Sequence, residues 1–185
     1  FKGCDVSLAA FDLASRRVPN LRLVSFGHGP PDARLPMPPG AAHTVQPPQA
    51  QLKDLYASCD AWLFGSRREG FGLPLLEAMA CRTPVIATPV GAAPELVTHG
   101  GGRLVKPEDP EDMARAIIEI CAMSQSEWQI LSAAAYTTAM KHNWHQAADG
   151  FEAALVKAID RTATGRFSSS AFESAPSRKV TDVSP

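Results

Sequence analysis

The chain has 185 residues, of which 45% are hydrophobic and 20% charged, which are ordinary values for a domain with its own core. Eighteen Lys and Arg residues against 19 Asp and Glu residues leave a formal net charge of -1. The chain therefore lacks the broad positive field that nonspecific binding to nucleic acid or anionic membranes requires, and no apolar run approaches the roughly 18–20 residues of a membrane-spanning helix.

The chain contains four cysteines, none of them in a C-x-x-C pair. This spacing predicts reduced, half-buried thiols in a cytoplasmic protein, because disulfide frameworks are typical of smaller secreted domains. The chain begins with Phe1 rather than Met and enters a helical pattern directly, without the shape of a signal peptide. We expect a natural N-terminal part to precede it.

The first expected element is a helix over residues 4–17, where Val6, Ala10 and Ala14 recur at helical spacing. A short strand follows over residues 21–26. Residues 29–48 hold seven prolines, which excludes a regular helix and indicates an extended connector, with a short strand at 43–46 as an option.

Helices and strands then alternate along the chain. We expect helices over 49–58, 72–81 and 93–98, and strands over 61–65, 84–88 and 103–106. After Pro110, Met113, Ala116, Ile117 and Ile120 follow the spacing of an amphipathic helix. Two further helices are expected over 125–141 and 145–160.

This alternation predicts an α/β fold, with a Rossmann-like parallel sheet covered by helices on both faces. One domain would span residues 1–161. Residues 162–185 contain six Ser and three Thr with few large apolar groups, which predicts a disordered tail.

The segment from Ser66 to Thr88 carries the features of a ligand site. Gly70 and Gly72 permit close approach of a ligand to the backbone, and Pro74 is tolerated only in the first turn of a helix. The helix therefore begins near Gly72, where free N–H groups and the positive end of the helix dipole form an anion site. A loop at the carboxyl end of a parallel strand is also where open α/β sheets bind ligands.

Two acids, Glu69 and Glu77, flank this anion site and stand eight positions apart. Acids beside a bound phosphate repel it unless they accept hydrogen bonds from other groups, such as paired hydroxyls. A nucleotide sugar, with a diphosphate between two diols, meets this need. Spacing alone still favours the simpler interpretation that both are ordinary acids at a helix start.

The stretch at 69–88, EGFGLPLLEAMACRTPVIAT, resembles the E-x7-E signature in the C-terminal half of group 1 retaining glycosyltransferases of the GT-B fold. Further stretches resemble other motifs of that family over about residues 1–120: KG at 2–3 with Asp5, NLRLVSFGHGP at 20–30, LYASCD at 55–60, GAAPELV at 91–97 and GRLVKPED at 102–109. The chain would then be one half of a GT-B fold.

The resemblance implies roles for the matched residues. Glu69 would hold hydroxyls of the donor sugar and Glu77 the ribose diol, while Lys2 would neutralise the diphosphate. Lys2 and Glu69 are thus the candidate catalytic residues. The other candidate donor-binding residues are Ser66, Gly70, Phe71, Gly72, Leu73, Gly27 and Gly29.

Three departures from the family pattern stand out. Arg82 occupies the position after the helix where the family has glycine, and a side chain in a left-handed cap there would be strained, so we expect a different turn. The proline-rich connector replaces the helix that follows the G-x-G-P motif. The family's central strand ahead of Lys2 and its N-terminal, acceptor-binding domain are missing, so upstream residues, another segment or another chain should fill the strand's place.

The resemblance implies a retaining glycosyltransferase of hexosyltransferase type, in polysaccharide biosynthesis, of which this chain is the donor-binding half. By itself it should bind donor without turnover. The expected partners are a nucleotide-sugar donor and, through the missing domain, an acceptor glycan or lipid-linked sugar. We expect no metal, no cofactor and no nucleic acid, and a cytoplasmic location with attachment at the inner membrane face left open. The alternatives are a nucleotide-sugar-binding module and another GT-B enzyme, epimerase or phosphorylase-like.

Overall fold

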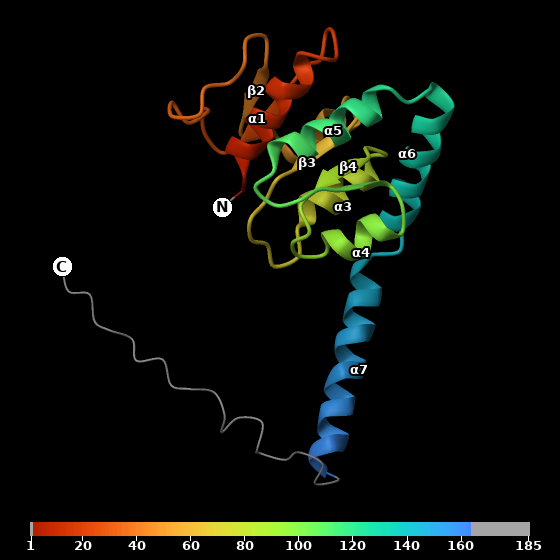
Figure 1. The fold of residues 1–185 in the computed structure, drawn as a ribbon. Helices are drawn as coiled ribbons and strands as arrows, with labels where there is room; N and C mark the ends of the chain where they lie inside the picture. Colours follow the sequence, from red (N-terminus) through yellow and green to blue (C-terminus); the bar gives the residue numbers. More distant parts are fainter. Residues whose placement is uncertain (1, 164–185) are drawn as a thin grey trace, which may run out of the picture. The chain divides into compact units, whose positions relative to one another are not determined.

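The structure is a computed structural model that describes residues 2–163 (Figure 1). The described part of the chain divides into two units, one that ends at residue 141 and one that begins at residue 142. The elements described in the first unit are α1 (Cys4–Ser15), β1 (Val24–Gly27), β2 (Ala42–Val45), α2 (Gln49–Ala57), β3 (Trp62–Phe64), α3 (Leu73–Ala80), β4 (Val85–Ala87), α4 (Ala93–Thr98), β5 (Gly102–Leu104), α5 (Pro110–Cys121) and α6 (Gln125–Ala139).

All strand pairs are parallel, as the alternation of strands and helices predicts. β1 pairs with β2, with Val24 opposite Ala42. β4 lies between β3 and β5, with Val85 opposite both Trp62 and Gly102. Among the described residues the two sheets are separate, so that β1 pairs only with β2 and β3 only with β4. The strand expected ahead of Lys2 stays a prediction.

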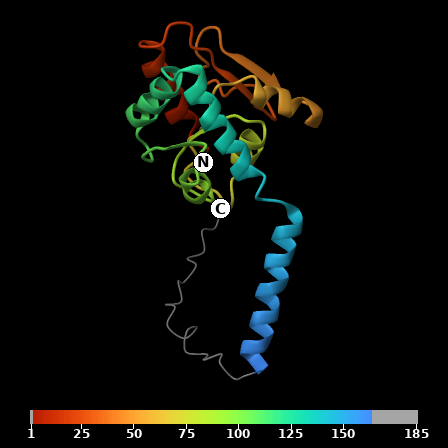
Figure 2. The same ribbon diagram turned by 90° about the vertical axis from the view of Figure 1, so that its right-hand side faces the viewer.

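Helices cover both faces of the sheet around β4, which confirms the predicted fold class (Figures 1 and 2). Val85 and Ala87 belong to the buried cluster formed with α3, α4 and α6. Ile86 belongs to the cluster formed with α1 and α5. Successive side chains of a strand point to opposite faces, so this one strand connects the two halves of the core.

The predicted elements are confirmed with small shifts at their ends. The expected strand at 21–26 is β1 at 24–27, and the optional strand at 43–46 is β2 at 42–45. The cysteines at 4, 59, 81 and 121 are free, as expected, but those at 4 and 121 are exposed rather than half-buried. Both lie on helices, where the apolar face is already filled by other side chains.

The turn after α3 corrects one prediction, because Arg82 does adopt the left-handed conformation, with φ of 63°. The turn keeps the glycine-type geometry, with the N–H of Thr83 donating to the carbonyl of Ala78 over 3.0 Å. Two contacts offset the strain. The guanidinium of Arg82 lies 4.3 Å from the ring centroid of Tyr136, and the backbone carbonyl of Arg82 accepts a hydrogen bond from Ser132 Oγ over 2.6 Å.

The described part of the second unit is one helix, α7 (Trp144–Ala163). Residues 144–161 are all exposed, and the expected single domain over residues 1–161 stays a prediction. Residues 162 and 163, expected in the tail, belong to α7, whereas residues 164–185 lie outside the described part. No described helix is both long and apolar enough to cross a membrane.

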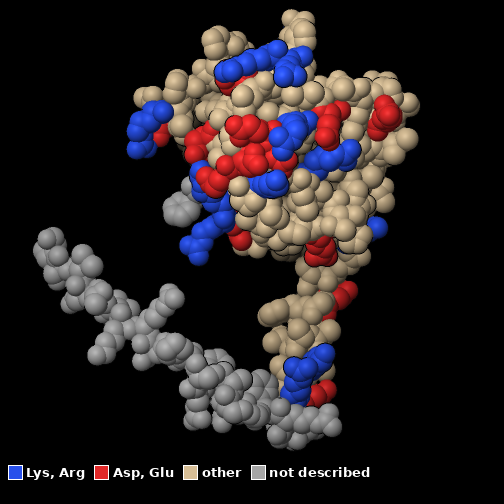
Figure 3. Space-filling model, in the orientation of Figure 1, with Lys and Arg blue, Asp and Glu red and all other residues tan. Residues whose placement is uncertain are grey.

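Charged side chains of both signs are mixed on the face that carries α5 (Figure 3). On that helix Arg115 pairs with Asp112 over 2.6 Å. This mixing agrees with the near-neutral composition and gives this face no single sign of charge.

Candidate functional site

The loops after β3, β4 and β5 leave the carboxyl ends of parallel strands and so gather at one edge of the sheet. The loop between β3 and α3, residues 65–72, carries Ser66 and Glu69 and is called the acidic loop here. Thr88 stabilises the start of this loop, because its Oγ1 donates a hydrogen bond to the carbonyl of Ser66 over 2.6 Å. The acidic loop therefore occupies the edge where open α/β sheets bind ligands.

The structure brings Lys2, Ser66 and Glu69 into direct contact. Oε1 of Glu69 accepts hydrogen bonds from Lys2 Nζ over 2.6 Å and from Ser66 Oγ over 2.8 Å. Its other oxygen, Oε2, accepts no hydrogen bond from residues 2–163. The side chain of Glu69 is 11% exposed, while that of Lys2 is 65% exposed. Glu69 is thus anchored through one oxygen, while the other is called open here because it has no hydrogen-bond partner among residues 2–163.

These contacts determine the protonation state of Glu69. Partial burial alone would raise its pKa, but the hydrogen bonds from Lys2 and Ser66 outweigh burial, so the pKa lies below the usual value of a glutamate. The carboxylate stays ionised at neutral and mildly acidic pH. It is therefore suited to accept hydrogen bonds from hydroxyl groups rather than to donate a proton.

The start of α3 presents open backbone N–H groups. The helix begins at Leu73 after Gly72, whose φ of 97° lies in the left-handed region that favours glycine, and Pro74 lies in the first turn as predicted. Within the described chain, the N–H groups of Phe71, Gly72 and Leu73 donate no hydrogen bond. They lie at the positive end of the helix dipole, which favours an anion.

The start of α3 and the acidic loop pack against core side chains and against the loop after β4. The ring of Phe64 and the side chain of Leu75 lie 3.1 and 3.3 Å from where a Cβ on Gly72 would be. Gly91, with φ of 57°, packs on the carbonyl of Phe71, which accepts from the N–H of Ala92 over 2.8 Å. The loop after β4 therefore fixes the backbone whose N–H groups are open.

Glu77 lies in the second turn of α3 and has a partner that the sequence did not indicate. Its Oε2 accepts a hydrogen bond from the hydroxyl of Tyr56 in α2 over 2.8 Å. Its Oε1 has no hydrogen-bond partner among residues 2–163. Glu69 and Glu77 thus share one arrangement, in which the protein holds one carboxylate oxygen and leaves the other open.

The Gly27–Gly29 turn is organised separately. The carbonyl of Gly29 accepts from His43 Nε2 over 2.8 Å, and the other ring nitrogen of His43 forms a hydrogen bond with Ser25 Oγ at 2.7 Å. Among the described residues, no hydrogen bond joins this turn to the acidic loop. Its place in a common site rests on its position after β1, at the carboxyl end of a parallel strand.

Arg67 was not identified from the sequence as a site residue, yet it connects three segments at this edge. Its guanidinium donates to both oxygens of Asp5, over 2.8 and 2.7 Å, and to both oxygens of Glu108, over 2.5 and 2.7 Å. Glu108 itself has a left-handed backbone, with φ of 57°. The start of α1, the acidic loop and the loop after β5 are therefore connected through one side chain.

This connection predicts an acid-sensitive stability. The hydrogen bonds from Arg67 lower the pKa of Asp5 to about 2 and also lower the pKa of Glu108. Because both pKa values are lower in the folded state, the stabilisation is complete above about pH 5 and is lost as the pH falls through about 4 toward about 2. Arg67→Gln should lower the urea midpoint at pH 7 and flatten its decline between these pH values.

The matched control is Arg68→Gln, at the exposed neighbouring arginine, for which the described chain provides no ion pair. Urea unfolding followed by circular dichroism at pH 7, 4 and 2.5 gives the comparison. An Arg67→Gln protein whose midpoint falls with acid as steeply as that of the unmodified chain would show that the connection carries no stability.

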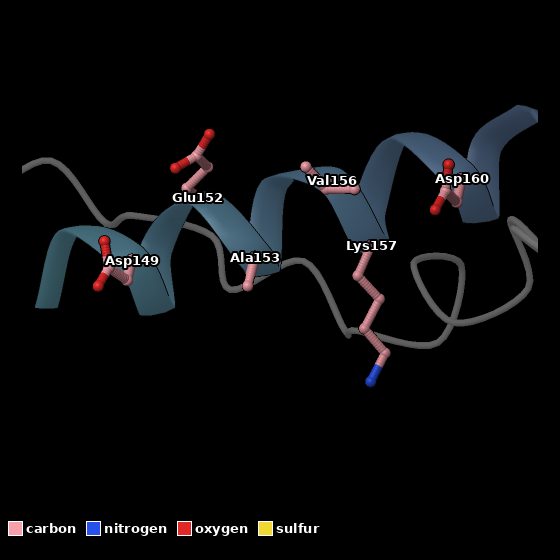
Figure 4. Close-up of a pocket in the computed structure, with 6 residues that line it drawn as sticks. All are labelled: Asp149, Glu152, Ala153, Val156, Lys157 and Asp160. Atoms are coloured by element: carbon pink, nitrogen blue, oxygen red, sulfur yellow. The ribbon is translucent and has the colours of Figure 1, made fainter. Parts of the chain in front are cut away.

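Two hollows of the described surface are lined by other residues. One runs along α7 and is lined by residues of that helix alone (Figure 4): Asp149, Glu152, Ala153, Val156, Lys157 and Asp160. The surface of a single helix is convex and cannot enclose a ligand. A second, with Gly100, Arg103 and Ile130 in its lining, lies where β5 begins, whereas the acidic loop follows the carboxyl end of its strand. Within residues 2–163 no group of three or more His, Cys, Asp or Glu could hold a metal ion.

Comparison with known proteins points to one family. The family model described as glycosyl transferases group 1 matches residues 1–123. The D-inositol 3-phosphate glycosyltransferase of Mycobacterium marinum is 32% identical over 184 residues, which cover 90% of this chain and 39% of the relative. That of Geodermatophilus obscurus is 37% identical over 113 residues, which cover 60% of this chain and 24% of the relative. The chain thus spans between a quarter and two-fifths of the length of these relatives.

Solved structures of similar fold agree with this assignment. Sucrose-phosphate synthase from Thermosynechococcus elongatus matches with a TM-score of 0.66 and 26% identity, over 86% of this chain and 43% of that one. HepE from Anabaena, solved in complex with UDP-glucose, matches with a TM-score of 0.58 and 27% identity, over 76% of this chain and 41% of that one. With two-thirds of its length matched by the family model and a fold shared with GT-B enzymes, the chain belongs to the group 1 glycosyltransferases.

Proposed function

We propose that this chain binds the nucleoside-diphosphate sugar of a glycosyltransferase that retains anomeric configuration, and that it forms the donor-binding half of that enzyme. The observation that carries the proposal is the shared arrangement of Glu69 and Glu77. Each carboxylate has one oxygen held by the protein and one open, and the open N–H groups at the start of α3 lie between them in the sequence. Acids and anion-binding amides in this order match a ligand with a hydroxyl-bearing sugar at each end of a diphosphate.

The site would promote departure of the nucleoside diphosphate. As the bond to the sugar breaks, negative charge develops on the diphosphate oxygens, and a fixed positive environment lowers the energy of that state. The N–H groups of Gly72 and Leu73 supply part of this environment. The ammonium of Lys2 supplies the rest by moving from Glu69 to the diphosphate, which its exposed position permits. Glu69, released by Lys2 but still held at Oε1 by Ser66, then orients the sugar hydroxyls.

The similar proteins indicate which donor nucleotide and which acceptor to test first. The Anabaena protein was solved with UDP-glucose, which makes a uridine nucleotide the first donor to test. The curated relatives are inositol phosphate glycosyltransferases, so a polyol phosphate is the first acceptor to test. The acceptor would contact the part of the enzyme outside this chain, so residues 1–185 alone should bind donor without transferring sugar. The free thiols at 4, 59, 81 and 121 support a cytoplasmic location.

Calorimetric titration with UDP, GDP and ADP, and then with their glucose conjugates, tests the proposal. Glu77→Ala should weaken the nucleoside diphosphate itself by about 10- to 100-fold, since hydrogen bonds to a charged group contribute about 1.5–3 kcal/mol. Glu69→Ala should remove the additional affinity that the sugar provides without weakening the binding of the nucleoside diphosphate itself, because Lys2 is then free to contact the diphosphate.

The control is Glu111→Ala, an exposed acid in the first turn of α5, which should leave both affinities unchanged. Equal losses for nucleotide and nucleotide sugar in both site variants would contradict the division of roles between the two acids. Sugar transfer by residues 1–185 alone would contradict the proposal that this chain is only the donor-binding half.

A further inference from the structure

Tyr56 is a buried residue whose only polar side-chain atom is directed at the candidate site. It lies in α2, 21 positions before Glu77 in the chain, and is 2% exposed. Its hydroxyl donates to Glu77 Oε2 over 2.8 Å. The glutamate is exposed and lies on a different helix, so this bond is the described contact that fixes where its carboxylate points.

The phenol ring is held rigidly. Its centroid lies 5.4 Å from that of Phe26 and 4.8 Å from that of Trp62, both in edge-on arrangements, and the rings of Phe26 and Trp62 stack at 5.5 Å. The backbone of Tyr56 is also fastened, because its carbonyl accepts from Thr83 Oγ1 over 2.7 Å. The two neighbouring rings and the hydrogen bond from Thr83 therefore hold the buried tyrosine more firmly than the exposed Glu77 is held. The hydroxyl of Tyr56 therefore positions the carboxylate of Glu77.

The bond also leaves Glu77 with acceptor capacity for two hydroxyl groups. An ionised carboxylate has about four acceptor sites, and Tyr56 occupies one of them. Oε1 is open, and Oε2 retains a second lone pair, so adjacent hydroxyls can donate to both oxygens. Burial and the neighbouring Glu77 raise the pKa of Tyr56, so its hydroxyl remains a donor through the whole pH range in which the protein is folded.

We infer that Tyr56 is a positioning residue that holds Glu77 for recognition of a vicinal diol and so determines the preference of the site for ribose over 2′-deoxyribose nucleotides. This inference rests on the proposed function, in which Glu77 binds the ribose of the donor. A carboxylate fixed at one oxygen accepts two hydroxyls without losing rotational freedom, whereas a free glutamate must first be ordered. Removing the phenol hydroxyl should therefore reduce discrimination between the two sugars more than it reduces nucleotide affinity in general.

The test is calorimetric titration of the full chain with UDP, GDP and ADP, each beside its 2′-deoxy counterpart. The unmodified protein should bind the ribose form of its preferred nucleotide roughly tenfold or more tightly than the deoxy form, as expected for one hydroxyl bonded to a charged acceptor. Tyr56→Phe keeps the ring and its packing, and should lower that ratio at least about threefold. Glu77→Ala should bring the ratio close to one.

The matched control is Tyr136→Phe, at the other tyrosine of the chain, whose ring faces Arg82. It should leave the ratio unchanged. A general loosening of the fold by Tyr56→Phe would weaken ribose and deoxyribose nucleotides equally and leave their ratio at the unmodified value, which overturns the inference. A ratio that Tyr56→Phe preserves while Glu77→Ala removes it also overturns the inference but leaves the proposed function standing. A ratio that survives Glu77→Ala rejects the role of Glu77 in the proposed function and the inference with it.

Discussion

Gly91→Ala is expected to weaken binding of a nucleoside diphosphate by about 100-fold, the loss that a displacement of about 1 Å produces at a precisely positioned site. A Cβ at this position would lie 2.5 Å from the carbonyl oxygen of Phe71 and 3.1 Å from Cβ of Glu69. Both neighbours belong to the acidic loop, and the closer of them is backbone, which cannot rotate away. The φ of 57° adds about 1–2 kcal/mol of strain for any side chain.

The measurement is the same calorimetric titration, with thermal unfolding recorded in parallel. Gly150→Ala is the control, because a Cβ at Gly150 would meet nothing within 4 Å and alanine favours a helix interior over glycine. That variant should bind nucleotide normally. Unchanged affinity in Gly91→Ala would mean that the loop after β4 does not determine the position of the N–H groups at the start of α3.

The elements that the sequence predicts correctly are those with local causes. The start of α3 follows from Pro74, which is compatible only with the first turn of a helix, together with a preceding glycine. α5 follows from the spacing of its apolar residues, and β4 from a run of residues buried on both faces. The acidic loop could therefore be located at the end of β3, where Lys2, Ser66 and Glu69 are in contact. The roles that the resemblance implies for these residues stay predictions.

The partners of these residues could not be predicted, because they come from distant parts of the chain. Tyr56 meets Glu77 across 21 positions, and Arg67 meets Asp5 across 62 and Glu108 across 41. A tyrosine among apolar residues in a helix predicts only burial, and adjacent arginines in a loop predict only solvation. The prediction of a different turn at Arg82 was wrong for a related reason. The contacts with Tyr136 and Ser132 that offset the strain of this turn come from distant parts of the chain.

Leu75→Ala is the substitution in α3 with the largest expected loss of stability, about 3 kcal/mol in the free energy of unfolding. Leu75 is fully buried, in a cluster with Phe64 and Met79, and its side chain lies directly beneath Gly72. Alanine there would leave a cavity that the packed neighbours cannot fill. The same cavity removes the support of the open N–H groups, so nucleotide affinity should fall along with stability.

Leu73→Ala is the matched control, two positions earlier on the same helix. Leu73 is 54% exposed, so the loss of its side chain should change the free energy of unfolding by no more than about 0.5 kcal/mol. Urea unfolding of both variants, followed by circular dichroism, separates burial from helix propensity, because the two substitutions are chemically identical. Equal destabilisation of both would place the stability of this segment in the helix itself, and the start of α3 would then owe its position to local structure rather than to the core beneath it.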